Sequence, residues 1–292
     1  MIILSGYPQD VVIPRVSRPA VVMGSAETVV RARELDSILP IKIAVGDLPW
    51  RAPELGPFDF WMCANSEWPL PWRKKDQKII ASTNVGVVLV SIVSVANLRS
   101  EQVSGCIESI RARSESQRPQ LRFIDTAHAS GHTCEPHCSI CVARQAMGLE
   151  FSIQECLKMS ANLDTLPFGG GDTVALHGFA LAILMGANPI YLSGIEIPMR
   201  AGDYTYIHGR HQPLRNIDTI YGQIRDIIRP RDPNTTSVLG ETIDCILADF
   251  GALTSIANEL GIRVVLLSET SRLRGIKGIE FGDFGPDCPS VY

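Results

Sequence analysis

The chain has 292 residues and a mass of 31.9 kDa, which is enough for one large domain or two modest ones. Hydrophobic residues make up 45% of it and charged residues 20%, a composition that excludes disorder over most of its length. The formal net charge is -4 and no long run of Lys or Arg occurs, so the sequence lacks the basic patch that nucleic-acid binding requires. A small ligand that carries phosphate is compatible with this charge.

Two apolar segments bear on whether the chain enters a membrane. Residues 1–14 lack a basic region and reach Asp10 before an apolar core develops, so we expect no secretory signal. Residues 173–195 are uncharged and long enough to cross a bilayer, but Gly186 and Pro189 divide them into a helix and a strand. We therefore expect a cytoplasmic protein without a transmembrane segment, and peripheral association with a membrane stays open.

Strand and helix patterns alternate along most of the chain. Short β-branched runs bounded by Gly, Pro or Asp predict buried strands, and longer runs with helical spacing predict helices. In chain order we expect a strand at 19–23, a helix at 28–39, strands at 41–45, 58–63, 78–81, 85–93 and 121–124, a helix at 173–186, a strand at 190–194, a helix at 241–260 and a strand at 263–267. The alternation predicts an α/β fold, a Rossmann-like and mostly parallel sheet with helices on both faces.

Three segments fit this sheet poorly. They are residues 114–166, which contain clustered Cys and His, residues 198–237, which are rich in Arg, Tyr and Pro, and the tail after Ser268. We expect one α/β domain over residues 1–292, with a Cys/His-containing insertion at 127–166 and a lid-like segment at 197–237. Because ligands of open α/β sheets bind beyond the carboxyl ends of strands, the lid-like segment, which directly follows a strand, is a candidate for function.

Two glycine turns precede helices. At the first, Gly24, Ser25 and Ala26 follow a strand, and free amides with the helix dipole would favour an anion there. The alternative is an ordinary turn with Ser25 as the helix N-cap. The second turn consists of Gly169, Gly170, Gly171, Asp172 and Thr173. Its glycines suit close approach to a phosphate or sugar, although it is neither a Walker loop nor a dinucleotide fingerprint; the alternative is a flexible linker with Asp172 as N-cap.

Acid, imidazole and hydroxyl groups follow the strand at 190–194. Glu196 places a carboxylate at the carboxyl edge of the sheet. The nearby Tyr204, His208 and His211 supply groups for acid–base chemistry. The alternative is a solvated surface loop.

Cysteine and histidine gather in one short stretch. Six metal-ligand side chains occur within fourteen residues, namely His128, His132, Cys134, His137, Cys138 and Cys141. Cys134, Cys138, Cys141 and one of His132 or His137 would suit tetrahedral zinc, the interpretation that we prefer. The C-x3-C-x2-C spacing also fits the [4Fe–4S] cluster of radical-SAM enzymes, and unliganded thiols are a further alternative. We expect no organic cofactor.

Five blocks of sequence share their order with a known family. They are Val21–Ala26, Phe60–Asn65, Ile79–Asn84, Ala180–Gly186 and Ile190–Glu196. Together they resemble the bacterial CMP-sialic-acid-dependent sialyltransferases, over most of the chain outside residues 114–166. The last block, which contains Tyr-Leu-Ser-Gly-Ile-Glu, is the most specific, and pterin diphosphokinase-like and flagellin-glycosylation accessory proteins share it.

The resemblance implies a nucleotide site and a lid. The candidate nucleotide-binding residues are Gly24, Ser25, Ala26, Asn65, Asn84, Gly170, Gly171, Asp172, Thr173 and Glu196. Tyr204 matches a lid tyrosine that donates to the phosphate. Pro198 stands where the family has a second tyrosine, and residues 235–241 lack the histidine that serves the family as base. His208 or His211 would have to take that role.

The function that the resemblance implies is glycosyl transfer from a CMP-activated, sialic-acid-like donor to a hydroxyl of a glycan or protein acceptor. A histidine would remove the acceptor proton while tyrosine and backbone donors stabilise the departing phosphate, without a metal. No Asp-x-Asp motif occurs, in agreement with this chemistry. The alternatives are a pterin diphosphokinase-like enzyme that uses ATP and Mg²⁺, and a non-catalytic nucleotide- or partner-binding module. Whether the chain forms a homo-oligomer stays open.

Overall fold

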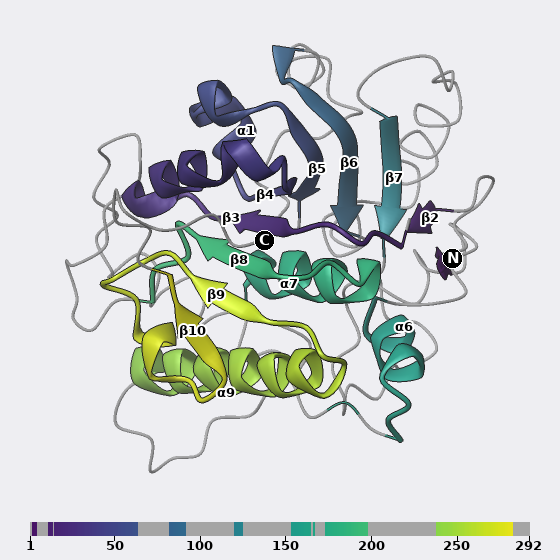
Figure 1. Ribbon diagram of the computed structural model, residues 1–292, viewed down its shortest axis with the longest axis vertical. Helices are drawn as coiled ribbons and strands as arrows, with labels where there is room; N and C mark the ends of the chain where they lie inside the picture. The colour runs from purple at the N-terminus through teal and green to yellow at the C-terminus, as the bar shows by residue number, and fades with distance from the viewer. Residues whose placement is uncertain are drawn as a thin grey trace.

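A parallel β-sheet is the centre of the molecule (Figure 1). The computed structural model describes residues 2–4, 11–13, 15–63, 82–91, 120–124, 153–164, 166, 173–197 and 238–282. The sheet has eight strands in the order β10-β9-β8-β3-β4-β5-β6-β7, and every neighbouring pair is parallel. They are β3 (Ala20–Met23), β4 (Ile41–Val45), β5 (Phe58–Cys63), β6 (Val85–Ser91), β7 (Gln120–Ile124), β8 (Ile190–Ser193), β9 (Val264–Leu266) and β10 (Ile279–Phe281). A separate antiparallel pair joins β1 (Ile2–Leu4) to β2 (Val11–Ile13).

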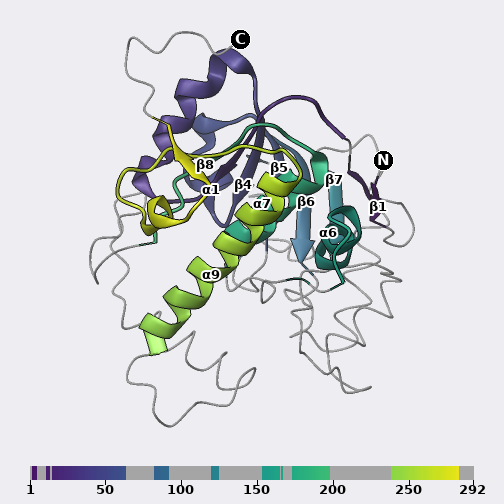
Figure 2. The same cartoon turned by 60° about the horizontal axis from the view of Figure 1, so that its bottom comes forward.

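Helices cover both faces of this sheet. They are η1 (Glu27–Ile38), α1 (Leu48–Arg51), η2 (Pro53–Leu55), α6 (Ile153–Ser160), α7 (Val174–Met185), α9 (Val238–Glu259) and η3 (Arg272–Gly275). On one face, α7 packs against β3, β4, β5 and β8, and α6 and α9 pack against α7. Figure 2 shows α9 crossing in front of α7. Val22 and Ile43 join the apolar cluster around α7, so the buried residues that alternate with them, such as Val21 and Ala44, face the other side, where η1 packs. This confirms the predicted α/β class.

The helix α7 is the apolar centre of the fold. Every residue from Ala175 to Met185 is buried, because the helix lies between the sheet and two other helices. Gly178 permits the close approach, since a Cβ there would lie 2.9 Å from Val45 Cγ1 and 3.0 Å from Val22 Cγ1. Gly186 ends the helix with a φ of 70°, as the sequence predicts for a C-terminal glycine. Within the described residues, no helix combines the length and the apolar character needed to cross a bilayer.

Most predicted elements are confirmed. The strands at 41–45 and 58–63 have the predicted bounds, and the other predicted elements that the structure describes differ from theirs by a few residues at their ends. The expected strand at 78–81 lies outside the described residues, as do most of the proposed insertion at 127–166 and all but one residue of the proposed lid at 197–237.

The expectation that the tail after Ser268 lies apart from the sheet is wrong. This tail contains η3 and β10, and β10 pairs with β9 to form one edge of the sheet. β10 has three residues, Ile-Glu-Phe, and a run that short gives no readable period. The sheet also enters the segment 114–166, whose β7 pairs with β6 and forms the opposite edge.

Candidate functional site

The sheet changes direction between β3 and β8. The chain adds strands outward from β3 to β7, then returns to the other side of β3 with β8. Because the two central strands are parallel and Met23 lies opposite Ser193, the chain leaves both at the same edge. The crevice outside such a switch point is the usual ligand site of open α/β sheets. The structure therefore places a candidate site at the carboxyl ends of β3 and β8.

Two glycines bring the loops after β3 and β8 together. A Cβ on Gly24 would overlap the carbonyl oxygen of Gly194, and a Cβ on Gly194 would lie 2.5 Å from the Cβ of Val29. Gly194 also has a φ of 65°, which side chains rarely adopt. The Gly24 amide donates to Ser193 O at 2.8 Å, and the Ala26 amide donates to Gly194 O at 3.1 Å. The expectation of free amides at this turn is therefore wrong for Gly24 and Ala26, since both already have acceptors.

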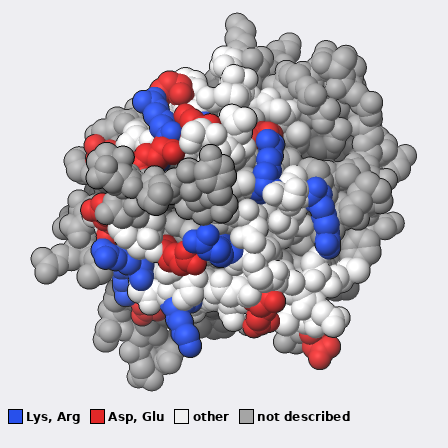
Figure 3. Space-filling model, in the orientation of Figure 1, with Lys and Arg blue, Asp and Glu red and all other residues white. Residues whose placement is uncertain are grey.

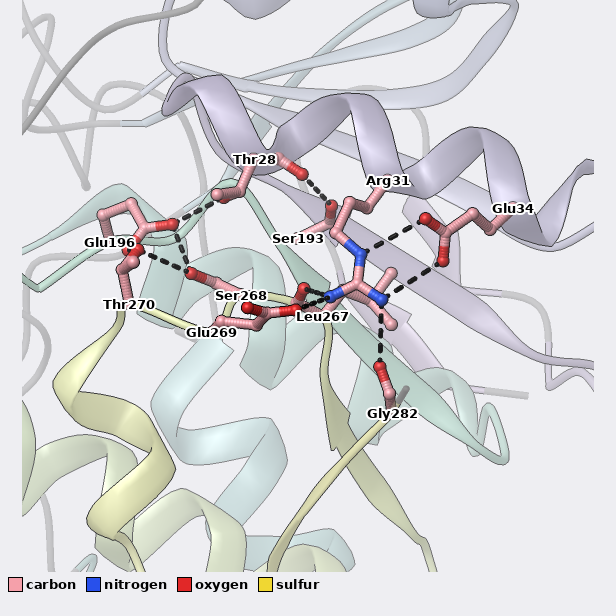
Figure 4. A network of polar contacts seen from close by, with 10 residues as sticks. All are labelled: Thr28, Arg31, Glu34, Ser193, Glu196, Leu267, Ser268, Glu269, Thr270 and Gly282. Carbon is pink, nitrogen blue, oxygen red and sulfur yellow. Dashed lines mark hydrogen bonds and ion pairs between the residues drawn. The ribbon is translucent and has the colours of Figure 1, made fainter. Parts of the chain in front are cut away.

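Glu196 follows this glycine contact, and its carboxylate accepts hydrogen bonds from three side-chain hydroxyls (Figure 4). Thr28 Oγ1, from the start of η1, donates to Oε1 at 2.6 Å. Ser268 Oγ, from the loop after β9, donates to the same oxygen. Thr270 Oγ1 donates to Oε2 at 2.8 Å. We call these four residues the hydroxyl clamp; it ties the loops after β8 and β9 to η1.

The hydroxyl clamp has a buried side and an open side. Ser268 is fully buried, Thr28 and Glu196 are half-buried, and Thr270 is exposed. Among the residues that the structure describes, no Lys or Arg forms an ion pair with Glu196. The three donors that the structure shows to the carboxylate are thus neutral hydroxyls.

Next to the hydroxyl clamp, Arg31 contacts several loops at the carboxyl edge of the sheet (Figure 4). Its Nη1 donates to Leu267 O at 2.6 Å, and its Nη2 donates to Gly282 O at 3.3 Å. Glu34 accepts from the same guanidinium at 3.2 Å, and Glu269 lies 3.7 Å from it. Because these acceptors come from η1 and from the loops after β9 and β10, Arg31 holds the three segments together.

Surface charge is mixed around these elements. On the face of the molecule that is turned toward the viewer in Figure 1, Figure 3 shows Lys and Arg side chains interspersed with Asp and Glu over the described residues. Several charged side chains of the described residues form pairs, such as Lys42 with Asp36 at 2.7 Å. The described part of this face therefore presents no large field of one sign.

The next strand along the sheet also ends in a polar residue. Asp47 follows β4, is buried, and lies 3.6 Å from Arg51 Nε. The guanidinium of Arg51 in turn stacks 3.9 Å from the centre of the Trp50 ring. This cluster lies beyond the carboxyl end of β4.

Thr173 opens α7 at the same edge. Its hydroxyl accepts from the Ala175 amide at 3.5 Å, so Thr173 is the N-cap, and the alternative of Asp172 in that role is wrong. The N-cap of η1 is Ala26, without a side-chain bond, so the alternative of Ser25 as N-cap is wrong as well. Because α7 returns the chain to the start of β8, its first turn lies near the carboxyl ends of the strands.

His177, in that first turn, is a titratable residue that sequence reasoning missed. It is buried, and loss of solvent lowers the pKa of its imidazole from 6.5 to about 4. The side chain is therefore neutral at pH 7. The sequence feature that could have identified His177 is that it lies within an otherwise apolar predicted helix.

Asn84 is the predicted site residue that the structure places elsewhere. It precedes β6, is exposed, and its carbonyl accepts from the Phe58 amide at 2.9 Å. Phe58 begins β5, so Asn84 lies at the amino edge of the parallel sheet. Gly24 and Glu196 lie at the carboxyl edge. The structure therefore does not bring Asn84 to the carboxyl edge, because Asn84 lies directly before the first residue of β6.

The remaining predicted site residues lie outside the described residues. They are Asn65, Gly170, Gly171, Asp172, Tyr204, His208, His211 and the suggested zinc ligands His132, Cys134, His137, Cys138 and Cys141. Within the described ranges, no group of three or more His, Cys, Asp or Glu is arranged to hold a metal ion. These assignments stay predictions.

Comparison with known proteins gives few matches. No family model and no curated protein matches the chain. Among solved structures, the chain is similar to the sialyltransferase CstII from Campylobacter jejuni in complex with the substrate analogue CMP-3FNeuAc, with 14% identity, 91% of this chain and 86% of that chain covered, and a TM-score of 0.44. It is also similar to a variant of sialyltransferase CST-II in complex with CMP, with 12% identity, coverage of 89% and 86%, and a TM-score of 0.42.

Proposed function

We propose that this chain is a glycosyltransferase that moves a sugar from a CMP-activated, sialic-acid-like donor to the hydroxyl of an acceptor. The observation that supports the proposal is the meeting of two sequence blocks. Val21–Ala26 and Ile190–Glu196 carry much of the resemblance to sialyltransferases, and their strands are direct neighbours at the switch point. Thr28 and Glu196 are 168 positions apart, yet their side chains are joined at 2.6 Å.

The candidate site at this point carries polar groups that suit a nucleotide sugar. It lies beyond the carboxyl ends of parallel strands and carries hydroxyl and carboxylate groups that suit a ribose or another sugar. Ser25 and Thr173 belong to the same edge and stay candidates for contact with the nucleotide.

The chemistry that we propose is metal-independent displacement at the anomeric carbon. His208 or His211 removes the proton of the acceptor hydroxyl, the new glycosidic bond forms, and the bond to the CMP phosphate breaks. Tyr204 donates a hydrogen bond to the departing phosphate. All three residues follow β8 in the sequence, within the proposed lid.

Thermal unfolding with different nucleotides tests this proposal first. The purified protein is heated with CMP, CDP, UDP, GDP, or ATP with Mg²⁺, because a ligand at 100 times its dissociation constant stabilises a protein by about 2.7 kcal/mol. We expect a shift with cytidine nucleotides, followed by release of CMP from a CMP-sugar when an acceptor is present. A shift confined to ATP with Mg²⁺ would instead support a diphosphokinase, and no shift with any nucleotide would contradict both enzyme functions.

A further inference from the structure

The two oxygens of the Glu196 carboxylate have different surroundings. Oε1 accepts from Thr28 and from the fully buried Ser268. Oε2 accepts from Thr270 at 2.8 Å, which is its one partner within the described residues. A carboxylate oxygen can accept two hydrogen bonds. Oε1 is therefore committed to the protein, whereas Oε2 has capacity left.

The partner of Oε2 is also the one that a ligand could replace. Thr270 is exposed, so water can solvate its hydroxyl when that group leaves the carboxylate. Ser268 lacks this option, because its hydroxyl is fully buried and would lose its acceptor. Exchange of one exposed hydroxyl for another at Oε2 conserves the number of hydrogen bonds, so it costs little free energy.

The carboxylate of the hydroxyl clamp determines which kind of ligand group can bind to it. A phosphate or a carboxylate offers this carboxylate further acceptor oxygens of like charge, which repel it, and no donor. Two hydroxyls on adjacent carbon atoms can instead donate hydrogen bonds to the two acceptor positions of Oε2. The clamp therefore suits a vicinal diol.

We infer that Glu196 Oε2 binds the ribose diol of the nucleotide, and that the Thr270 hydroxyl occupies this position until the ribose displaces it. The inference rests on the proposed function, since it assigns one part of the nucleotide to one atom of the proposed site. It implies that the protein distinguishes ribonucleotides from deoxyribonucleotides.

Binding of CMP and its deoxy analogues tests the assignment. Dissociation constants are measured by calorimetry for CMP, 2′-deoxy-CMP and 3′-deoxy-CMP with the full-length protein. Loss of a hydrogen bond to a charged acceptor should weaken binding of at least one deoxy analogue roughly tenfold or more. In Glu196→Gln this preference for CMP should fall to within about twofold. The matched control is Glu34→Gln, which removes a carboxylate from the neighbouring network and should keep the preference.

A second variant addresses the risk that Glu196→Gln disturbs the fold. Thr270→Val leaves the carboxylate and removes the competing hydroxyl, so CMP should bind as tightly as before or more tightly, with the preference intact. Equal binding of CMP and both deoxy analogues to the unaltered protein would overturn the inference and leave the proposed function standing. The inference would also be overturned if the preference for CMP over the deoxy analogues survived in Glu196→Gln, or if it disappeared in Thr270→Val. Absence of CMP binding altogether would contradict the proposed function and the inference with it.

Discussion

The two edges of the sheet are held together in different ways. At the amino edge, the Asn188 side chain joins the turn before β8 to the turn before β9. Its amide nitrogen donates to Gly261 O at 3.0 Å, and its amide oxygen accepts from the Arg263 amide at 3.1 Å. Its neighbour there is an exposed pair, Arg263 with Glu280. At the carboxyl edge, the half-buried Glu196 and the mostly buried Arg31 each join several loops. The amino edge thus relies on one amide side chain and a solvated ion pair, whereas the carboxyl edge is joined by buried and half-buried polar side chains.

The largest effect is expected on catalysis at the carboxyl edge. Under the proposed function, replacing the true base by His208→Ala or His211→Ala should lower turnover about 10²–10⁴-fold while CMP binding stays nearly unchanged, since a general base acts on the reacting proton. Initial rates of CMP release and calorimetry with CMP measure the two quantities. Asn84→Ala, at the amino edge, is the control and should leave both unchanged. Unchanged turnover in both histidine variants would remove these residues from the mechanism.

The next effect concerns pH and the buried His177. The pKa of this imidazole is about 4 in the folded protein, below its ordinary value of 6.5, so the folded state binds the proton less well than the unfolded state. Its neutral form therefore supports full stability above pH 6.5, and stability falls as the pH drops toward 4. The loss should reach about 3 kcal/mol at pH 4, from 1.36 kcal/mol per pKa unit. Urea unfolding of the wild type and of His177→Met between pH 4 and 7 measures it. An identical pH dependence in both proteins would contradict the prediction.

A smaller effect is expected from the loop contacts of Arg31. Arg31→Met keeps much of the apolar stem but leaves Leu267 O and Gly282 O without this donor, so we expect a loss of about 1–3 kcal/mol. Urea unfolding at pH 7 measures the change. The matched control is Arg33→Met on the exposed side of the same helix, which should change stability by less than about 0.5 kcal/mol. Equal losses in both variants would show that the loss comes from helix charge and not from the loops.

The smallest effect belongs to the amino edge. Arg263 and Glu280 are each about half exposed, and Glu280→Gln should cost less than about 1 kcal/mol at pH 7. The guanidinium of Arg263 lowers the pKa of Glu280 below its ordinary 4.5, so the contribution is present above that value and is lost as the pH falls through the lowered pKa. Added salt should reduce it further. A loss larger than that of Arg31→Met would reverse the contrast between the two edges.

Sequence patterns predicted the frame of the molecule better than its site. Apolar runs such as Ala20–Met23 form strands because burial on both faces requires apolar side chains at every position, which leaves a clear signal. The partners of Glu196 left no such signal. Thr28, Ser268 and Thr270 lie 168, 72 and 74 positions away, and only the strand order brings them together. Asn84 lies at the amino edge, and a motif that resembles a family does not say at which edge of the sheet its residues lie.

The pairing of β3 with β8 has a consequence for how the protein is made. Ala20 lies opposite Ile190, so the two central strands are separated by 170 positions in the chain. During synthesis, β3 can pair with β4 and the strands that follow it long before β8 has left the ribosome. Until then the middle of the finished sheet is an open edge, with backbone groups ready to pair with any other strand. We therefore expect nascent chains that end before residue 190 to be the species most prone to aggregate, and the closing of this seam to be a late and slow step.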